Sequence, residues 1–353
     1  LFALSLCLST LLNQCLHKTY NLSNPRKEKK QMKNTRKLLS IILAILMIAT
    51  TVPFAFAADE IPDFSDAKVI TADASGLVYV DGVALEITGY SSNRVTLPEG
   101  EYKLTSNIST TYLIWIDDEA VLDLNGYTWD LNDYSINLNA PLSVYDTSTD
   151  KTGKITSNSN ATIWISNEVA VFSLYSGTVE NTKSTTGGYA IYASWVGANL
   201  YGGKVISYGY AVALNNSPII DQKLTLGDVV LESGEGYAQI NLRLSNYANW
   251  TEAVINVTDY TGESLEAYVE SSIPDKVKIL EGIKSAEDAE KYRINVEPVY
   301  SYLFHEKTEY DEATGDINIY VAENTFTQQP SAENNYTVDF SNPFATFQWY
   351  ELA

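Results

Sequence analysis

Residues 112–259 repeat one pattern six times, and this repeat limits the possible folds more than any other feature of the chain. In each copy, a six-residue segment with apolar third and fifth positions is followed by a second apolar segment that ends in Asn, Gly or Asp. The first segments begin 22, 27, 28, 21 and 28 residues apart: Tyr112–Asp117, Tyr134–Asn139, Ala161–Ser166, Tyr189–Ser194, Tyr210–Asn215 and Ala238–Arg243. An imperfect repeat with a period in the twenties, made of strands and turns, predicts a solenoid of stacked coils.

The alternation within the first segments predicts which side chains line the interior. Strand pleating places odd positions on one face and even positions on the other. The third positions are Ile114, Ile136, Ile163, Ile191, Val212 and Ile240, and the fifth are Ile116, Leu138, Ile165, Ala193, Leu214 and Leu242. Like residues of stacked coils lie about 4.8 Å apart, so we expect two internal aliphatic ladders with the odd positions inside.

The second segments end in residues that suit a corner between strands. They are Leu122–Gly126, Leu142–Asp146, Phe172–Gly177, Leu200–Gly203, Leu224–Asp228 and Ile255–Asp259. Gly, Asn and Asp tolerate left-handed or bulged backbone. Gly-x-apolar steps at Gly153, Gly177 and Gly203 then begin a third short strand, and three strands per coil predict a parallel β-helix.

Four segments carry a resemblance to a known family. Gly100–Leu104, Leu122–Thr128, Gly188–Tyr192 and Tyr201–Val205 resemble the right-handed, pectate-lyase-like β-helix segments of large Gram-positive surface proteins. The resemblance covers residues 97–259 and implies a surface location. Its motifs belong to the scaffold, so it implies no particular activity.

The N-terminal part of the chain has the features of an export signal. Lys33, Arg36 and Lys37 precede the apolar run Leu38–Ile48, and Ala55–Ala57 is a small-x-small cleavage site, so we expect residues 32–57 to be a signal peptide. Residues 1–31 are then an upstream, non-native translated segment. Residues 58–96 are expected to form a linker and an N-terminal β cap, with Asp81-Gly82 as a type I′ hairpin turn.

After Asp259 the repeat fades. Ser285 is a helix N-cap candidate before an acidic first turn, and strands are expected at 294–299 and 316–321, so residues 260–325 are predicted to be a small α+β cap or spacer. Residues 326–353 resemble the opening strands of bacterial immunoglobulin-like repeats, in which the Trp at the position of Trp349 packs in the core. The expected fold class is all-β: a right-handed parallel β-helix with these flanking parts and a truncated Ig-like sandwich.

The charge of the chain excludes several partners. Its formal net charge is −21, and removal of residues 1–57 takes away eight Lys or Arg and one Glu, which leaves 15 basic and 43 acidic residues. A field of this sign repels nucleic acid and anionic membranes, so contact with a membrane is expected only through the signal peptide. Residues 58–353 contain no Cys, so we expect no disulfide, and we expect a monomeric module.

Catalytic and metal-binding residues do not form a recognisable set. Asp117-Asp118-Glu119 is an acidic turn in which calcium is possible, although no specific motif supports it, so no cofactor is predicted. The six copies contain a single arginine, Arg243. Glu232 and Glu235 precede it in a turn, and Arg243 is expected to be a solvated residue rather than a catalytic base. His305 has no Cys or His partner for zinc and is expected at the surface.

The fourth positions form the candidate binding site. This column contains Trp115, Asn137, Trp164, Tyr192, Ala213 and Asn241, and it points outward if the odd positions are inside. Sugar rings stack on aromatic planes while amides hydrogen-bond their hydroxyl groups. The first four residues of the column are therefore a candidate site for a polysaccharide or a host or cell-wall glycan, unless a loop or a terminal domain covers the rings.

We expect a secreted, non-enzymatic adhesion or carbohydrate-binding module of a larger bacterial protein, attached to the cell surface through a missing C-terminal region. Two alternatives remain open. One is a polysaccharide lyase or glycoside hydrolase on the same scaffold, and the other is a structural surface stalk that binds nothing. Retention of a glycan would separate the binding module from the stalk, and turnover of a pectin-like substrate would identify the enzyme.

Overall fold

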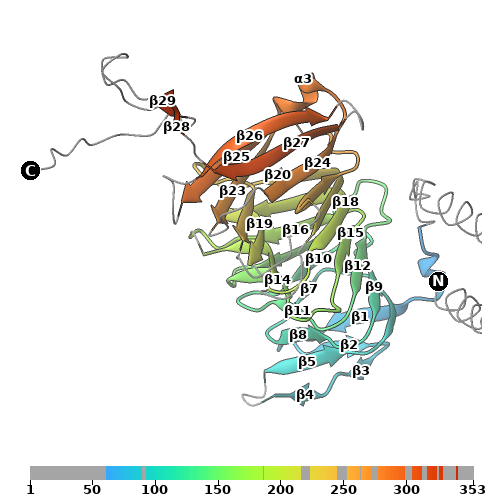
Figure 1. Cartoon of the computed structure of the whole chain (residues 1–353). Coiled ribbons are helices and arrows are strands. Elements are labelled where there is room, and N and C mark those ends of the chain that lie inside the picture. The colour runs from blue at the N-terminus through green and yellow to red at the C-terminus, as the bar shows by residue number, and fades with distance from the viewer. Residues whose placement is uncertain are drawn as a thin grey trace, which may run out of the picture. The chain divides into compact units, whose positions relative to one another are not determined.

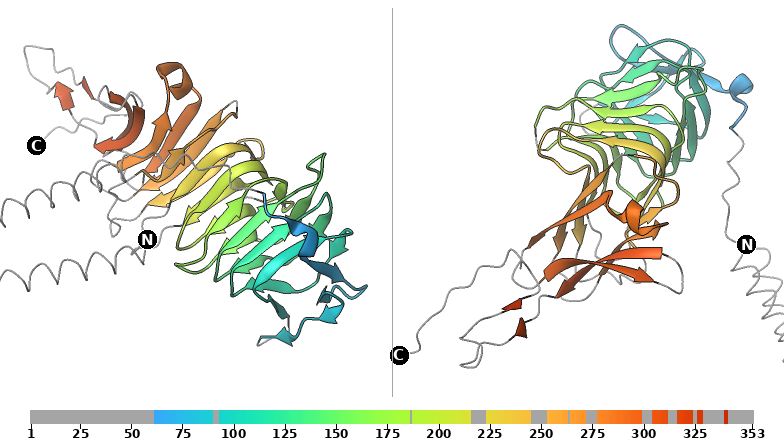
Figure 2. Two further views of the ribbon diagram at one scale, coloured as in Figure 1. Left: turned by 90° about the vertical axis from the view of Figure 1, so that its right-hand side faces the viewer. Right: turned by 90° about the horizontal axis from the view of Figure 1, so that it is seen from above.

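The computed structural model is an all-β solenoid of about six turns whose strands form three ladders (Figure 1). It describes residues 61–89, 93–185, 187–215, 223–244, 253–262, 264–271, 277–298, 304–311, 316–323, 326–328 and 339–340. Strands of successive coils pair side by side, and the coils are stacked one above another (Figure 2). Within the described part of the chain, no helix is long and apolar enough to cross a membrane.

Ladder 1 is formed by the first strand of each coil. Its parallel strands are β5 (Arg94–Leu97), β8 (Leu113–Ile116), β11 (Ile136–Leu138), β14 (Ala161–Ile165), β17 (Tyr189–Ala193), β19 (Tyr210–Asn215), β21 (Ile240–Leu244), β23 (Leu265–Ser271) and β25 (Tyr292–Pro298). β4 (Ile87–Thr88) pairs antiparallel with β5. Parallel pairing therefore continues through β23 and β25, beyond the fading of the sequence repeat at Asp259.

Ladders 2 and 3 complete each coil. Ladder 2 contains β6 (Gly100–Leu104), β9 (Ala120–Asp123), β12 (Leu142–Tyr145), β15 (Phe172–Leu174), β22 (Ile255–Val257) and β24 (Val277–Ile283). Ladder 3 contains β7 (Ile108–Ser109), β10 (Thr128–Asp130), β13 (Lys154–Ser157) and β16 (Thr178–Asn181). The longer strands β18 (Ala198–Ser207) and β20 (Leu224–Glu232) run through both ladders.

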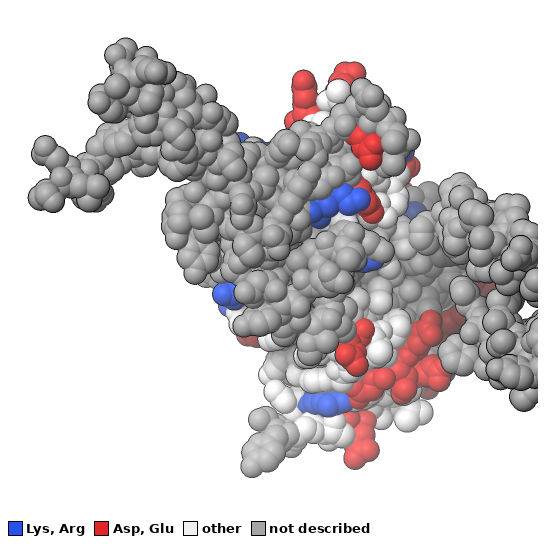
Figure 3. Space-filling model, viewed as in Figure 1, with Lys and Arg blue, Asp and Glu red and all other residues white. Residues whose placement is uncertain are grey.

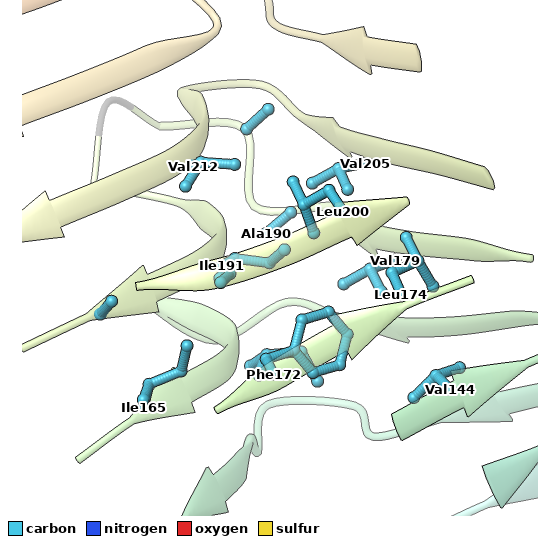
Figure 4. Packing of buried hydrophobic residues seen from close by; sticks show 14 of the residues in the cluster. Val144, Ile165, Phe172, Leu174, Val179, Ala190, Ile191, Leu200, Val205 and Val212 are labelled. Atoms are coloured by element: carbon cyan, nitrogen blue, oxygen red, sulfur yellow. The ribbon is translucent and has the colours of Figure 1, made fainter. Parts of the chain in front are cut away.

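The two predicted aliphatic columns are confirmed as internal ladders. Ile136 pairs in register with Ile114 and Ile163, and the column continues through Ile191 and Val212 to Ile240. The fifth-position column pairs in the same way, and all twelve side chains are at most 2% exposed. Inside the coils these residues meet ladders 2 and 3, where Phe172, Leu174 and Val179 pack against them (Figure 4).

The corner between ladders 2 and 3 uses residues with positive φ, as the sequence predicts. Asn125 has φ 47°, Gly177 φ 86° and Gly203 φ 79°. A Cβ atom on Gly203 would lie 2.4 Å from the carbonyl oxygen of Gly177, so the corner also requires glycine for close approach of the backbones. The buried carboxylate of Asp146 accepts hydrogen bonds from the amides of Gly126 at 2.8 Å and Gly153 at 2.6 Å. These bonds satisfy backbone donors that the ladders leave unpaired.

The segments at the two ends contain other predicted features. β2 (Val78–Val80) and β3 (Val83–Ala84) form the expected hairpin, with Asp81 at φ 49° and Gly82 at φ 77°. β1 (Lys68–Ala72) pairs with β2 and with β6, and η1 (Phe64–Asp66) precedes it. The short helix α3 (Ala286–Ala289) has Ser285 as its N-cap, as predicted.

The C-terminal described strands lie after the last coil. β26 (Phe304–Asp311) and β27 (Asp316–Glu323) form an antiparallel hairpin, and β27 also pairs with β24. β28 (Phe326–Gln328) and β29 (Asp339–Phe340) form a separate pair. The predicted signal peptide and upstream segment, and all but these last two strands of the predicted Ig-like segment, lie outside the described residues.

Candidate functional site

The outer face of ladder 1 carries the predicted outward column in register. Asn137 pairs with Trp115 on one side and with Trp164 on the other, and Trp164 pairs with Tyr192. The column then passes through Ala213 and Asn241 and continues into Tyr268 and Asn295, two residues outside the sequence repeat. The structure thus brings the four candidate residues together on adjacent strands.

Trp164 is the most exposed residue of this column. Its side chain is 37% exposed, although Trp is among the residues that proteins usually bury. The indole meets the ring of Tyr192 edge to face at 5.3 Å, and its Nε1 donates a hydrogen bond to Ser194 Oγ at 3.2 Å. These two contacts orient the indole on the sheet.

The prediction that all odd positions point inward is wrong for the first-position residues Tyr189 and Tyr210, although Ala161 and Ala238 at the same position are buried. Tyr189 is half-buried, and its ring contacts the outward Tyr192 ring at 5.3 Å, whereas the next residue, Ala190, is fully buried. In the preceding coil the second-position Thr162 is also buried and donates a hydrogen bond to the carbonyl oxygen of Glu180 in ladder 3. After Tyr189 and after Tyr210 two consecutive residues are buried, so the strand bends there and the alternation begins only at the third position, whereas Ala238 and Gln239 keep the alternation.

This bend adds tyrosines from several coils to the outer face. Tyr189 stacks on Tyr210, with ring centroids 6.2 Å apart and planes within 12°. Tyr210 contacts Tyr268 at 6.1 Å and Tyr237 at 5.9 Å, and Tyr237 contacts Tyr208. We define the aromatic strip as the resulting run of ring-to-ring contacts, which comprises Trp164, Tyr192, Tyr189, Tyr210, Tyr237, Tyr208 and Tyr268.

The sequence analysis missed five members of the strip: Tyr189, Tyr208, Tyr210, Tyr237 and Tyr268. A signal existed at the first position, since four of the six copies begin with Tyr. Strict alternation assigned that position to the interior. Tyr208 and Tyr237 lie outside the six-residue segments, and their placement depends on how the connections between ladders fold back.

A polar column runs beside the aromatic strip at the sixth position of the repeat. Asn139 Nδ2 donates to Asp117 Oδ1 at 2.8 Å, and Ser166 Oγ donates to Asn139 Oδ1 at 3.1 Å. Further along, Ser194 accepts from Trp164, and Asn215 Nδ2 donates to the hydroxyl of Tyr192. Amide and hydroxyl groups therefore border the rings over several coils.

In the part of the chain that the structure describes, the N-terminal end of the outward column combines an ion pair with three buried atoms that lack a hydrogen-bond partner, one of which is Nε of the paired Arg94. The Arg94 guanidinium lies 4.1 Å from the ring centroid of Trp115 and forms an ion pair with Asp117. Among the described residues, the buried atoms Trp115 Nε1 and Asn137 Oδ1 have no hydrogen-bond partner. One of these atoms is a donor and the other an acceptor, and leaving each unpaired costs roughly 1–3 kcal/mol.

The electrostatic character of the site is neutral to acidic. Acidic side chains gather on the described surface over the N-terminal strands, where few basic side chains are visible (Figure 3). Burial, together with the nearby Tyr192, raises the pKa of the Tyr189 hydroxyl, so this phenol stays protonated at neutral pH. The rings thus present uncharged faces to a ligand.

The other sequence candidates lie apart from the strip or are already engaged. Asp117 is held by Arg94 and Asn139, while Asp118 and Glu119 are exposed. Arg243 is exposed at the end of the polar column, opposite Glu270 in the β21–β23 register. His305 lies in β26. Within the part of the chain that the structure describes, no three His, Cys, Asp or Glu side chains are close enough to hold a metal ion.

A second, shorter ring ladder lies on ladder 2. Tyr145 and Tyr175 stack at 4.4 Å with planes within 5°, and Tyr175 contacts Tyr201 at 5.0 Å. Phe64 of η1 packs on Tyr145 at 5.8 Å, so the N-terminal end of this ladder is covered by the chain itself.

No protein-family model, curated protein or solved structure matches the chain.

Proposed function

We propose that the solenoid is a non-enzymatic carbohydrate-binding module and that the aromatic strip is its binding surface. The observation that carries the proposal is the unbroken run of ring contacts from Trp164 to Tyr268 beside a column of hydrogen-bonding side chains. Sugars offer apolar ring faces and a rim of hydroxyl groups, and this surface offers aromatic planes and a polar rim. The two chemistries match along several coils.

The unpaired atoms of Trp115 and Asn137 support the same proposal. The indole N–H needs an acceptor and the amide oxygen needs a donor. A hydroxyl group both donates and accepts, so a hydroxyl-bearing ligand satisfies either atom. Neither atom is exposed, so a ligand reaches them only after rotation of a neighbouring side chain.

The proposed setting is the bacterial surface. We propose a cleaved signal peptide at residues 32–57, a right-handed coil of the pectate-lyase-like type, an N-terminal β cap, a C-terminal spacer and the start of an Ig-like domain. The features that support this setting are the charged, apolar and small-residue order of residues 32–57 and the resemblance of residues 97–259 and 326–353 to Gram-positive surface proteins. Adhesion through a surface-bound glycan is the role that follows.

The test is retention on a glycan array by the purified protein and by Trp164→Ala. Loss of the exposed indole is expected to lower affinity about tenfold, since an aromatic contact contributes roughly 0.5–1.5 kcal/mol beyond area burial. Tyr201→Ala, on ladder 2, is the matched control and retains binding. If the unsubstituted protein retains no glycan of any class, the proposal is wrong and the structural stalk becomes the better interpretation.

A further inference from the structure

We infer that the ligand of the aromatic strip is an uncharged, linear polysaccharide that lies along the stacking direction of the coils, across several strands. This inference rests on the proposed function and names the chemical class and direction of the ligand.

The length of the strip requires an extended ligand. Ring contacts connect β14, β17, β19 and β23, and β21 lies between the last two. Four strand spacings of about 4.8 Å give roughly 19 Å. A monosaccharide covers about one strand spacing, so only an oligomer of several sugar units contacts the whole strip.

The direction of the strip fixes the direction of the ligand. Trp164 and Tyr192 occupy the same register position on adjacent strands, and Tyr189 and Tyr210 do so three positions earlier in the repeat. These two pairs advance along the stacking axis, perpendicular to the strands, and the contact between Tyr192 and Tyr189 within β17 joins them, so the strip as a whole extends from β14 to β23 along that axis. A linear chain that runs in this direction meets similar chemistry at every coil.

The charges around ladder 1 favour an uncharged chain. Three arginines lie along the ladder, and each has an acidic neighbour: Arg94 pairs with Asp117, Arg293 lies 3.9 Å from Glu266, and Arg243 lies opposite Glu270 in the register. Uronate or sulfate groups need arginine or lysine that is available for pairing. The net charge of −21 further opposes an anionic polymer.

The experiment measures the affinity of the purified protein for oligosaccharides of increasing length. The probes are neutral cello-, xylo-, manno- and chito-oligosaccharides of two to eight units, with polygalacturonate and heparin as anionic polymers. We expect affinity for one neutral series to rise with length and to level off at about four or five units, the span of the strip. We also expect this affinity to be nearly unchanged between low and high salt, because no ion pairs form.

Two substitutions locate the ligand on the strip. Trp164→Ala and Tyr210→Ala remove rings from different coils, and each is expected to lower affinity for the long oligosaccharide about tenfold. A disaccharide is too short to contact both rings, so its affinity is expected to fall in at most one of the two variants. Tyr210→Phe keeps the ring and is expected to bind normally, which separates loss of stacking from loss of folding.

Three results would overturn the inference. Affinity that does not depend on length would indicate an end-binding site, and tighter, salt-sensitive binding of polygalacturonate or heparin would indicate an anionic ligand. In both cases carbohydrate binding itself would stand. Failure to bind any of these oligosaccharides or polymers would overturn both this inference and the proposed function.

Discussion

At the scale of single residues, tyrosine occupies two contrasting environments in this protein. Tyr102 is fully buried in the core of an N-terminal coil, where its hydroxyl donates to the carbonyl oxygen of Pro98. Tyr208, at one end of the aromatic strip, is 46% exposed. Burial disfavours the charged phenolate and raises the pKa of Tyr102 to about 12. The same residue type is thus structural in one place and available for contact in another.

The raised pKa of Tyr102 predicts alkaline destabilisation. In the unfolded chain the phenol titrates near pH 10, so between about pH 10 and 12 the folded state holds a proton that the unfolded state has released. Stability from this group is therefore complete below pH 10 and is lost as the pH rises toward 12, by up to about 3 kcal/mol. Urea unfolding at several pH values measures the loss, and it should be smaller in Tyr102→Phe. An equal loss in both proteins would contradict the assignment, with Tyr292, whose pKa is also about 12, as the next group to test.

At the scale of one strand, neighbouring residues separate stability from binding. In β14, Ile163 and Ile165 are fully buried in the two internal ladders, while Trp164 between them is exposed. Alternation of this kind fixes the register, because a one-residue slip would exchange the two faces. The same strand therefore contributes to the core with one face and to the candidate site with the other.

Two substitutions in β14 are expected to have opposite effects. Ile163→Ala leaves a cavity among packed aliphatic side chains and should lower the free energy of unfolding by about 2–5 kcal/mol, with glycan binding kept at temperatures where the protein is folded. Trp164→Ala should change stability by less than about 1 kcal/mol and should weaken binding. Urea unfolding and glycan binding, measured on both variants, check the pair. Comparable losses of stability in the two variants would show that the indole is part of the core.

At the scale of the whole molecule, acidic charge is distributed along a solenoid in which each coil is stabilised by contacts with its neighbouring coils. In such a solenoid the stability is approximately a sum of terms from coils and from the contacts between them. The formal charge of −21 adds repulsion between coils. Salt screens repulsion between exposed charges over about 10 Å at 0.1 M.

Stability is therefore expected to rise with ionic strength at neutral pH. Raising sodium chloride from low to high concentration should increase Tm by roughly 3 °C, since screening lowers the repulsion in the folded state. Thermal unfolding monitored by circular dichroism measures the shift. The control is the same series near the isoelectric pH of about 4.4, where the shift should disappear. A Tm that falls with salt at neutral pH would mean that ion pairs such as Lys154–Glu180 outweigh the repulsion.

The sequence determined the parts of this protein that depend on local periodicity. The columns that begin at Ile114 and Ile116, the Asp81-Gly82 hairpin and the Asn and Gly corners follow from two-residue alternation and from backbone preferences, which act over a few residues. The column of Trp115, Asn137, Trp164 and Tyr192 follows in the same way, because parallel stacking aligns equal positions of the repeat.

Only the tertiary structure decided which other residues reach that face. The bend at the start of β17 and β19 turns Tyr189 and Tyr210 outward, and the connections between ladders bring Tyr208 and Tyr237 into contact with them. β23 and β25, by contrast, keep the apolar third and fifth positions of the repeat, as Ala267, Val269 and Ile294 show, so the sequence pattern already carried a signal for the outward Tyr268. The first-position Tyr recurs in four of the six copies, but two-residue alternation assigns it to the interior, and Tyr208 and Tyr237 lie outside the six-residue segments. The repeat therefore predicted an outward column, and the fold turned that column into a connected aromatic strip.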